Sequence, residues 1–245
     1  MIGVSRMEYG IQMYSIRDLA EKDLDAALGA VAEIGYRYVE FAGFFGHTAE
    51  EVKAMLDKHG LKVSGTHTQF AELENDFEET VKFHKAIGNT NIIVPGHDIF
   101  SREKLDAFID KCNAIVPKLA AEGIRFGFHN HSGEFAPVDG VVPEIELENR
   151  TDIQLELDTF WAFNAGEDPL VWMERLYSEG KLSVIHLKDG FKGGRGVALG
   201  EGEAPVAEVR ALAEKLGVTI VVESEGLDPT GREEVERCFR YLSTH

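Results

Sequence analysis

The chain has 245 residues, of which 44% are hydrophobic and 28% charged, which is ordinary for a globular protein and a length that α/β barrels often use as one domain. Its formal net charge of −18 argues against binding to nucleic acid or to anionic membranes, because both rely on clustered Lys and Arg. We therefore expect one domain over residues 1–245, with neither nucleic acid nor a membrane as its partner.

Cys112 and Cys238 are the only cysteines, too few for a disulfide scaffold and without the paired spacing of a thiolate metal site. The N-terminal segment lacks the apolar core and the cleavage site of a signal peptide, and no run approaches the roughly 18 apolar residues that cross a bilayer. These features predict a soluble, unprocessed protein of the cytoplasm.

Short apolar runs alternate with amphipathic segments along the whole chain. The runs rich in β-branched and aromatic residues predict strands at residues 9–14, 36–41, 61–66, 91–94, the start of 124–135, 153–158, 182–187 and 218–222. The segments with apolar residues at helical spacing predict helices at residues 24–34, 48–60, 77–87, 105–121, 142–147, 169–177, 206–216 and 232–242.

Residues that favour helix ends mark several of these boundaries. Asp23 is a good N-cap, and Thr48 followed three residues later by Glu51 is the capping-box pattern. Pro117 predicts a kink or an early break in the long helix at 105–121, because proline lacks the amide donor that a helix interior needs.

Eight strand–helix units at spacings of roughly 25–35 residues, with no linker rich in Pro, Gly or Ser, predict a (β/α)8 barrel. An open doubly wound sheet would normally offer a glycine-rich dinucleotide turn after its first strand, but residues 12–18 read QMYSIRD. The predicted fold class is therefore α/β, a TIM barrel in a single domain.

The active site of such a barrel lies at the C-terminal ends of its strands. The predicted strand ends carry more polar side chains than a packed core explains: Gln12, Ser15, Arg17, Glu40, His67, His97, His129, Asn130, His131, Glu134, Asp158, His186, Lys188, Asp189, Glu223 and Glu225. Taken singly, each could be a hydrogen-bonded structural group, and Glu40 could be a barrel-lining residue paired with Arg17 or Lys188. Their convergence is what indicates a functional site.

Carboxylates and imidazoles delivered by four consecutive strands would repel one another or titrate unless a cation neutralised them. Mixed Asp, Glu and His ligands suit a divalent ion such as Mn²⁺, Mg²⁺, Co²⁺ or Zn²⁺, and the lack of thiolates removes the usual structural zinc arrangement. The sequence therefore predicts one divalent metal ion at the mouth of the barrel.

A succession of motifs resembles a known family: IQMYSIRD at 11–18, HNHSGEF at 129–135, LDTFW at 157–161, HLKD at 186–189 and VVESEG at 221–226. The chain is similar, over nearly its whole length, to the sugar phosphate isomerase/epimerase superfamily. These are xylose isomerase-like TIM barrels that include ketose 3-epimerases and inosose dehydratases. The resemblance implies that Asp158, His186 and Glu223, from the last three strands, bind the metal.

The first ligand position departs from the family pattern. The epimerases of the family place a glutamate in the fifth strand, where this sequence has His129, and the nearest carboxylate is Glu134. The fourth ligand is therefore Glu134 or His129. We favour Glu134, with His129 and His131 facing the substrate, and the two histidines resemble the branch nearer the inosose dehydratases.

A polyhydroxy carbonyl substrate that chelates the metal would have its α C–H acidified, because the cation stabilises the charge that develops. Glu223 is the expected base, and His131 or His129 could supply the second proton-transfer group, since imidazole titrates near neutrality. Returning the proton gives epimerisation or isomerisation, whereas expelling a β-hydroxyl gives dehydration.

Several further side chains are expected to bind the sugar. Lys188 could bind a substrate oxygen or orient a carboxylate, and Trp161 could offer an apolar face to sugar C–H groups; a rim salt bridge and a core role are the alternatives. The other predicted substrate-binding residues are Gln12, Glu40 and His67. The glycine-rich segment 191–203 predicts a mobile lid or substrate loop.

These features together predict a divalent-metal-dependent isomerase or epimerase that acts on a sugar or sugar derivative. A dehydratase or lyase of an inosose or keto-sugar is the first alternative. A non-catalytic sugar-binding barrel is the second, and the acidic balance argues against a nuclease of this fold. The expected partner is a small-molecule sugar, and the chain could form a homo-oligomer.

Overall fold

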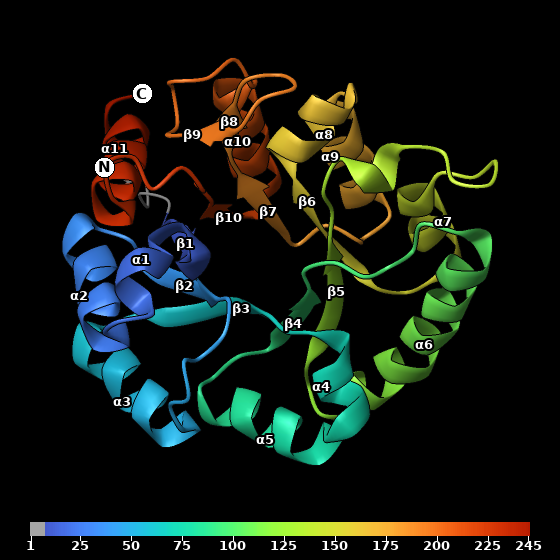
Figure 1. The fold of residues 1–245 in the computed structure, drawn as a ribbon, viewed down its shortest axis with the longest axis horizontal. Helices are drawn as coiled ribbons and strands as arrows, with labels where there is room; N and C mark the ends of the chain where they lie inside the picture. Colours follow the sequence, from blue (N-terminus) through green and yellow to red (C-terminus); the bar gives the residue numbers. More distant parts are fainter. Residues whose placement is uncertain (1–7) are drawn as a thin grey trace, which may run out of the picture.

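Eight parallel strands close into a barrel at the centre of the molecule, and helices form a ring around it (Figure 1). This computed structural model describes residues 8–245, so most of the segment considered for a signal peptide lies outside the described residues. The order around the ring is β1-β10-β7-β6-β5-β4-β3-β2, so the first and last strands of the barrel are neighbours. The predicted TIM barrel is confirmed.

The strands that build the barrel are short and buried. They are β1 Gly10–Gln12, β2 Tyr38–Phe41, β3 Lys62–His67, β4 Asn91–Val94, β5 Arg125–His129, β6 Gln154–Asp158, β7 Val184–Leu187 and β10 Thr219–Val222. Each overlaps a predicted strand. Two further strands of two residues each form a small antiparallel pair beside the barrel, β8 (Asp189–Gly190) and β9 (Gly196–Val197).

The helices are α1 Arg17–Ala20, α2 Leu24–Ile34, α3 Ala49–His59, α4 Phe70–Asn75, α5 Phe77–Ala86, α6 Arg102–Ala121, α7 Pro143–Arg150, α8 Thr159–Ala165, α9 Pro169–Ser178, α10 Val206–Leu216 and α11 Gly231–Thr244. The predicted capping signals are confirmed. Asp23 accepts a hydrogen bond from the Ala26 amide at 2.9 Å, and Thr48 and Glu51 form the capping box of α3. No helix within residues 8–245 is long and apolar enough to cross a membrane.

Three local predictions need correction. Helix α6 runs through Pro117 without a break, since its buried face, which includes Cys112, Ile115 and Leu119, packs on the core along its whole length. The first strand ends at Gln12 because its side chain accepts a hydrogen bond from the Tyr14 amide and so starts a 3-10 turn, Met13–Ile16. The short helices α4 and α8 were not predicted.

The register of the strands sets the height of the site. Parallel pairing places Gln12 of β1 beside Glu40 of β2, and Asp158 of β6 beside His186 of β7. Successive side chains of a strand point to opposite faces, so these residues enter the barrel at matched levels while their neighbours pack against the helices. The interior of the barrel is therefore polar at its C-terminal end, whereas most of the other buried side chains are apolar.

Candidate functional site

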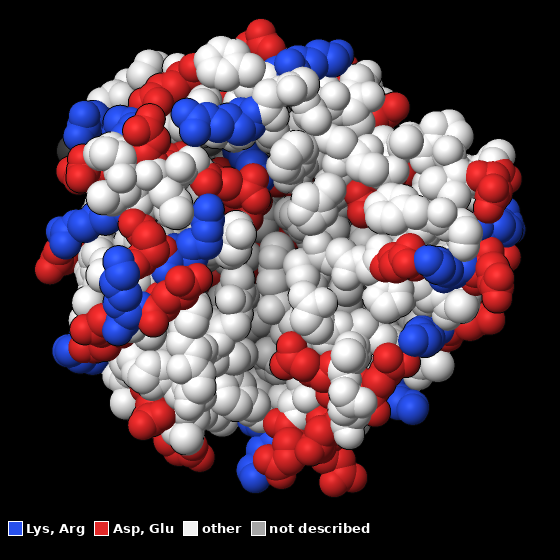
Figure 2. All heavy atoms as spheres, in the orientation of Figure 1, with Lys and Arg blue, Asp and Glu red and all other residues white. Residues whose placement is uncertain are grey.

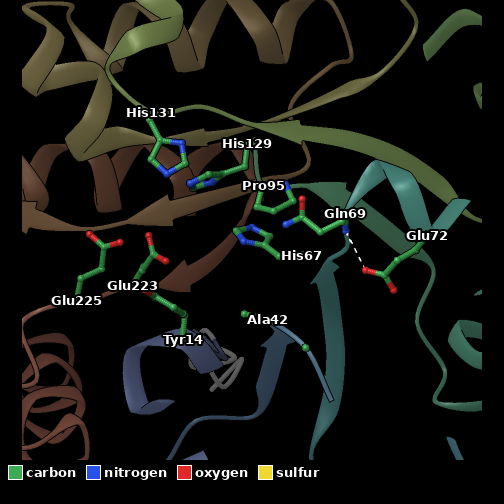
Figure 3. A pocket seen from close by; sticks show the side chains of 11 residues that line it. Tyr14, Ala42, His67, Gln69, Glu72, Pro95, His129, His131, Glu223 and Glu225 are labelled. Atoms are coloured by element: carbon green, nitrogen blue, oxygen red, sulfur yellow. Dashed lines mark hydrogen bonds between the residues drawn. The ribbon is translucent and has the colours of Figure 1, made fainter. Parts of the chain in front are cut away.

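A pocket of about 440 Å³ opens at the C-terminal ends of the strands. Figure 2 shows the molecule hollowed near the centre of this view. The pocket is lined by Tyr14, Ala42, Gly43, His67, Gln69, Glu72, Pro95, His129, His131, Glu223 and Glu225 (Figure 3). Most of these residues end a barrel strand or begin the loop after it, which is where enzymes of this fold carry their chemistry.

Four buried side chains converge at the C-terminal ends of the strands: His129, Asp158, His186 and Glu223. Two of them, His129 and Glu223, line the pocket. We call the four residues the mouth group. One ligand atom from each lies within 4.8 Å of the others. Their strands are consecutive in the barrel, which explains why side chains nearly 100 residues apart meet. The predicted convergence of Asp158, His186 and Glu223 is present in the structure.

Asn130, between the two histidines of the HNH motif, holds the ends of two strands together. Its side-chain oxygen accepts a hydrogen bond from the Asp158 amide at 2.9 Å, and its nitrogen donates to the Asp158 carbonyl at 3.3 Å. The carboxylate of Asp158 then caps α8, with Oδ1 accepting from the Trp161 amide at 2.8 Å. Asn130 therefore positions Asp158 rather than the substrate.

A second set of side chains, the inner group, consists of His67, His129, Glu156 and His186 and shares two histidines with the mouth group. His67 Nε2 lies 2.8 Å from Glu156 Oε2, and His186 Nε2 lies 2.7 Å from Glu40 Oε1. Glu156 was not predicted as a site residue. Its position in the strand could have indicated it, because a residue two positions before Asp158 points to the same side of the strand.

Burial and neighbouring charges shift the ionisation of these groups. Burial, together with the carboxylate of Glu40, raises the pKa of Glu156 to about 7. Burial also raises the pKa of Asp158 to about 7, in spite of the nearby Lys188. Burial alone would lower the pKa of His186, but the carboxylates of Glu156 and Glu40 raise it well above its usual value. Such perturbed groups are typical of functional sites.

Glu223 stays ionised because two cationic groups face it. Burial would raise its pKa, but Lys188 and His186 hold the pKa well below its usual value. Lys188 is fully buried, and its Nζ lies 3.1 Å from Glu223, 2.6 Å from Glu225 and 3.7 Å from Asp158. Lys188 was expected either to bind a substrate oxygen or to orient a carboxylate, and these contacts match the second role.

Glu134 lies outside both groups, although it was the favoured fourth ligand. Its Oε2 accepts a hydrogen bond from the His131 amide at 2.8 Å, so it shapes the loop after β5. The His131 side chain is exposed and lines the pocket together with His129. Within residues 8–245, the clusters with metal-ligand spacing contain His129 and not Glu134.

The remaining predicted substrate-binding residues lie at different depths. His67 lines the pocket, whereas Gln12 and Glu40 are fully buried below it and hydrogen-bonded to each other at 2.7 Å. The ring of Trp161 lies beside the site, with its centre 4.6 Å from Lys188 Nζ. Gln12 and Glu40 therefore contact other side chains of the barrel rather than the pocket.

The segment expected to be a mobile lid is tied to the barrel by one carboxylate. Asp189 accepts hydrogen bonds from the backbone amides of Gly190, Gly200, Gly202 and Ala204 at 2.8 to 3.1 Å. Gly202 lies so close that an added Cβ would sit 2.3 Å from the Asp189 carboxylate. These contacts hold the end of the segment, at Gly200 and Gly202, beside Asp189.

The mouth group fits a divalent metal ion. Asp158 Oδ2 is buried and has no hydrogen-bond partner in the part of the chain that the structure describes. An unpaired buried carboxylate oxygen is costly, and a cation would satisfy it. Two carboxylates and two imidazoles also match the ligands that divalent ions of the first transition row, zinc included, prefer.

A family model for the xylose isomerase-like TIM barrel matches residues 28–242. The chain belongs to this family. The resemblance to the sugar phosphate isomerase/epimerase superfamily that the motifs carried is therefore confirmed.

One relative by sequence and two solved structures with the same fold are similar to this xylose isomerase-like barrel. The 2-oxo-tetronate isomerase of Haemophilus influenzae is 28% identical over an alignment of 164 residues, and the match covers 55% of this chain and only 63% of that protein's length. A crystal structure of a sugar phosphate isomerase/epimerase from Parabacteroides distasonis is 23% identical, with a TM-score of 0.85 over 99% of this chain and 95% of that one. The probable 3-DHS dehydratase AsbF of Bacillus anthracis is 13% identical, with a TM-score of 0.76 over 98% and 100% of the two chains.

Proposed function

We propose that this xylose isomerase-like barrel is a divalent-metal-dependent isomerase or epimerase of a sugar or sugar derivative. The observation that carries the proposal is the mouth group, four buried donors within 4.8 Å of one another, of which His129 and Glu223 line the pocket. The isomerase activities named for the relatives support the same reaction class. The sugar itself is left open at this stage.

In this proposal His129, Asp158, His186 and Glu223 hold the metal ion, with His129 in the position for which Glu134 was favoured from the sequence. Two observations support the exchange. His129 belongs to the mouth group, and the Glu134 carboxylate already accepts the His131 amide. His186 would bind through Nδ1, which lies 3.3 Å from Glu223 Oε2, because Nε2 already contacts Glu40.

A bound divalent ion would stabilise the negative charge that develops on the substrate oxygen. Glu223 would remove the proton next to the carbonyl group. It lines the pocket, and Lys188 keeps its pKa well below its usual value after burial is taken into account, so it is ionised at neutral pH. Lys188 would hold the Glu223 carboxylate in place, since their contact is 3.1 Å.

His131 would be the second proton-transfer group. Its ring faces the same space as Glu223 from the opposite side of the pocket (Figure 3). The Glu134 carboxylate accepts a hydrogen bond from the His131 amide, and this contact holds the backbone that carries the His131 ring. An imidazole and a carboxylate on opposite sides could return the proton to the neighbouring carbon or to the other face.

A dehydratase is the second candidate. The two proton-transfer groups are unlike, and an elimination needs one base and one acid that protonates the departing hydroxyl. The same pair of Glu223 and His131 would serve, and AsbF shares the fold. Both candidates begin with the same loss of a C–H proton.

The test is solvent exchange in D₂O, with Mn²⁺ supplied and a panel of ketoses, inososes and 3-keto-sugars. The wild type should incorporate deuterium next to the carbonyl of at least one compound, and Glu223→Gln should abolish the incorporation. Glu208→Gln, an exposed position on α10, is the matched control and should exchange like the wild type. Exchange that survives in Glu223→Gln would refute the role of this residue, and a wild type inert toward the whole panel would refute the proposed function.

A further inference from the structure

We infer that this pocket selects an uncharged polyhydroxy carbonyl compound and discriminates against phosphorylated or carboxylated sugars. The inference deepens the proposed function and rests on it. The superfamily name refers to sugar phosphates, so the charge of the pocket is a property of this chain that needs its own argument.

Apart from three histidines, the titratable side chains that line the pocket are those of Tyr14 and three glutamates. Glu72, Glu223 and Glu225 contribute carboxylates, and no Lys or Arg belongs to the lining formed by residues 8–245. Phosphate and carboxylate groups are normally recognised by Arg or Lys, often through paired hydrogen bonds. An anionic substrate group would instead meet carboxylates here, and like charges repel strongly in a partly buried site.

The nearest cation below the pocket is not free to bind a substrate anion. Lys188 is fully buried, and its Nζ contacts Glu223 at 3.1 Å and Glu225 at 2.6 Å. Binding a phosphate would require Lys188 to leave two carboxylates that are themselves largely buried. Its charge is therefore already matched within the protein.

The nearest cation at the rim is also engaged. Arg17 donates to the Tyr14 carbonyl at 2.9 Å and to the Glu225 carbonyl at 3.1 Å, and its guanidinium lies 4.1 Å from the centre of the Tyr14 ring. Two of its nitrogens are thus occupied by backbone carbonyls, Nη1 by Tyr14 and Nη2 by Glu225. Arg17 therefore stabilises the wall of the pocket, and it is not among the residues that line it.

The lining suits hydroxyl groups. Glu72, Glu225 and Gln69 can accept hydrogen bonds from sugar O–H groups, and Gln69 and Glu72 stand on one wall of the pocket (Figure 3). The Tyr14 ring is 43% exposed and can pack against sugar C–H groups. The pocket thus offers acceptors and an aromatic face rather than an anion site.

The experiment compares matched ligands on the Mn²⁺-loaded wild type. Each ketose in the panel is measured beside its 6-phosphate and beside the sugar acid of the same carbon number, by deuterium exchange and by direct binding. We expect the neutral member of a set to exceed the charged members in kcat/KM by at least about tenfold, a single step of 1.4 kcal/mol. A phosphate or carboxylate preferred over its neutral partner would overturn the inference.

The two readouts separate this inference from the proposed function. Binding of neutral sugars in preference to anions, without exchange in any compound, would refute the reaction and keep the ligand class. Exchange that favours anions would keep the reaction and refute the ligand class. A wild type that shows neither deuterium exchange nor sugar binding would refute both the reaction and the ligand class.

A charge reversal tests the cause. Glu72→Lys should improve kcat/KM for the 6-phosphates relative to the neutral ketoses by about tenfold, because it places a cation at the rim. Glu78→Lys, on the neighbouring helix α5 and outside the lining, changes the net charge equally and is the control. An equal effect of both variants would show that only the overall charge matters and would overturn the assignment to Glu72.

Discussion

The two ring nitrogens of His186 contact two different layers of carboxylates. Nδ1 lies 3.3 Å from Glu223 Oε2, and Nε2 lies 2.7 Å from Glu40 Oε1, which in turn accepts from Gln12. A carboxylate on the outer nitrogen of a metal-binding histidine fixes the orientation of the ring. Gln12 and Glu40, first considered as substrate-binding residues, thus have the contacts of a support beneath the proposed metal site.

The assignment of the fourth ligand leads to a direct comparison of two variants. His129→Gln should weaken Mn²⁺ affinity by at least about tenfold, whereas Glu134→Gln should change it less, because Glu134 bonds the His131 backbone amide. Titration against a fluorescent chelator measures both affinities. The reverse order would return Glu134 to the metal and leave His129 to the substrate.

At the scale of elements, helix α7 buries the carboxyl group of Glu144. Glu144 is 1% exposed, and its Oε2 has no hydrogen-bond partner among the described residues. Burial, with the carboxylates of Glu134 and Glu148, raises the pKa of Glu144 to about 8. The folded protein therefore favours the protonated acid at this position.

This raised pKa predicts a pH-dependent stability. The unfolded chain releases the Glu144 proton near pH 4.5, whereas the folded chain releases it near pH 8. The free energy of unfolding is therefore highest below pH 4.5 as far as this group is concerned, and it falls as the pH rises to about 8. Glu144→Gln should remove this dependence and stabilise the protein above pH 8 by a few kcal/mol. Urea unfolding from pH 5 to 9 measures it, with Asp152→Asn as the exposed control. Parallel pH profiles of the wild type and Glu144→Gln would contradict the account.

At the scale of the whole molecule, the proposed metal site takes its four donors from the ends of four barrel strands, over residues 129–223. Mn²⁺ at 100 times its dissociation constant should therefore stabilise the folded protein by about 2.7 kcal/mol, because the unfolded chain does not hold the four donors together. The rise in melting temperature should be absent in Asp158→Ala, which lacks one donor. A similar rise in that variant would show that the ion acts elsewhere.

The sequence predicted the barrel because strand and helix signals repeat eight times, and local signals such as the Thr48 capping box fix the boundaries. Asp158, His186 and Glu223 were found because each ends an apolar run. The inner group was harder. Glu156 interrupts a strand that reads as apolar, and its contact with His67 depends on the closure of the ring.

The adjacency of β1 and β10 has a consequence for how the protein is made. The ring closes only when β10 enters between β7 and β1, and α11 then packs against α2, with the Tyr36 hydroxyl bonded to the Val235 carbonyl. Glu223 follows β10 directly, so a ribosome delivers the last donor of the mouth group together with the closing strand. The proposed metal site is therefore incomplete in any fragment that ends before β10. A circular permutant cut between β7 and β10 would have to pair these two strands across its new termini before Glu223 could lie beside His186.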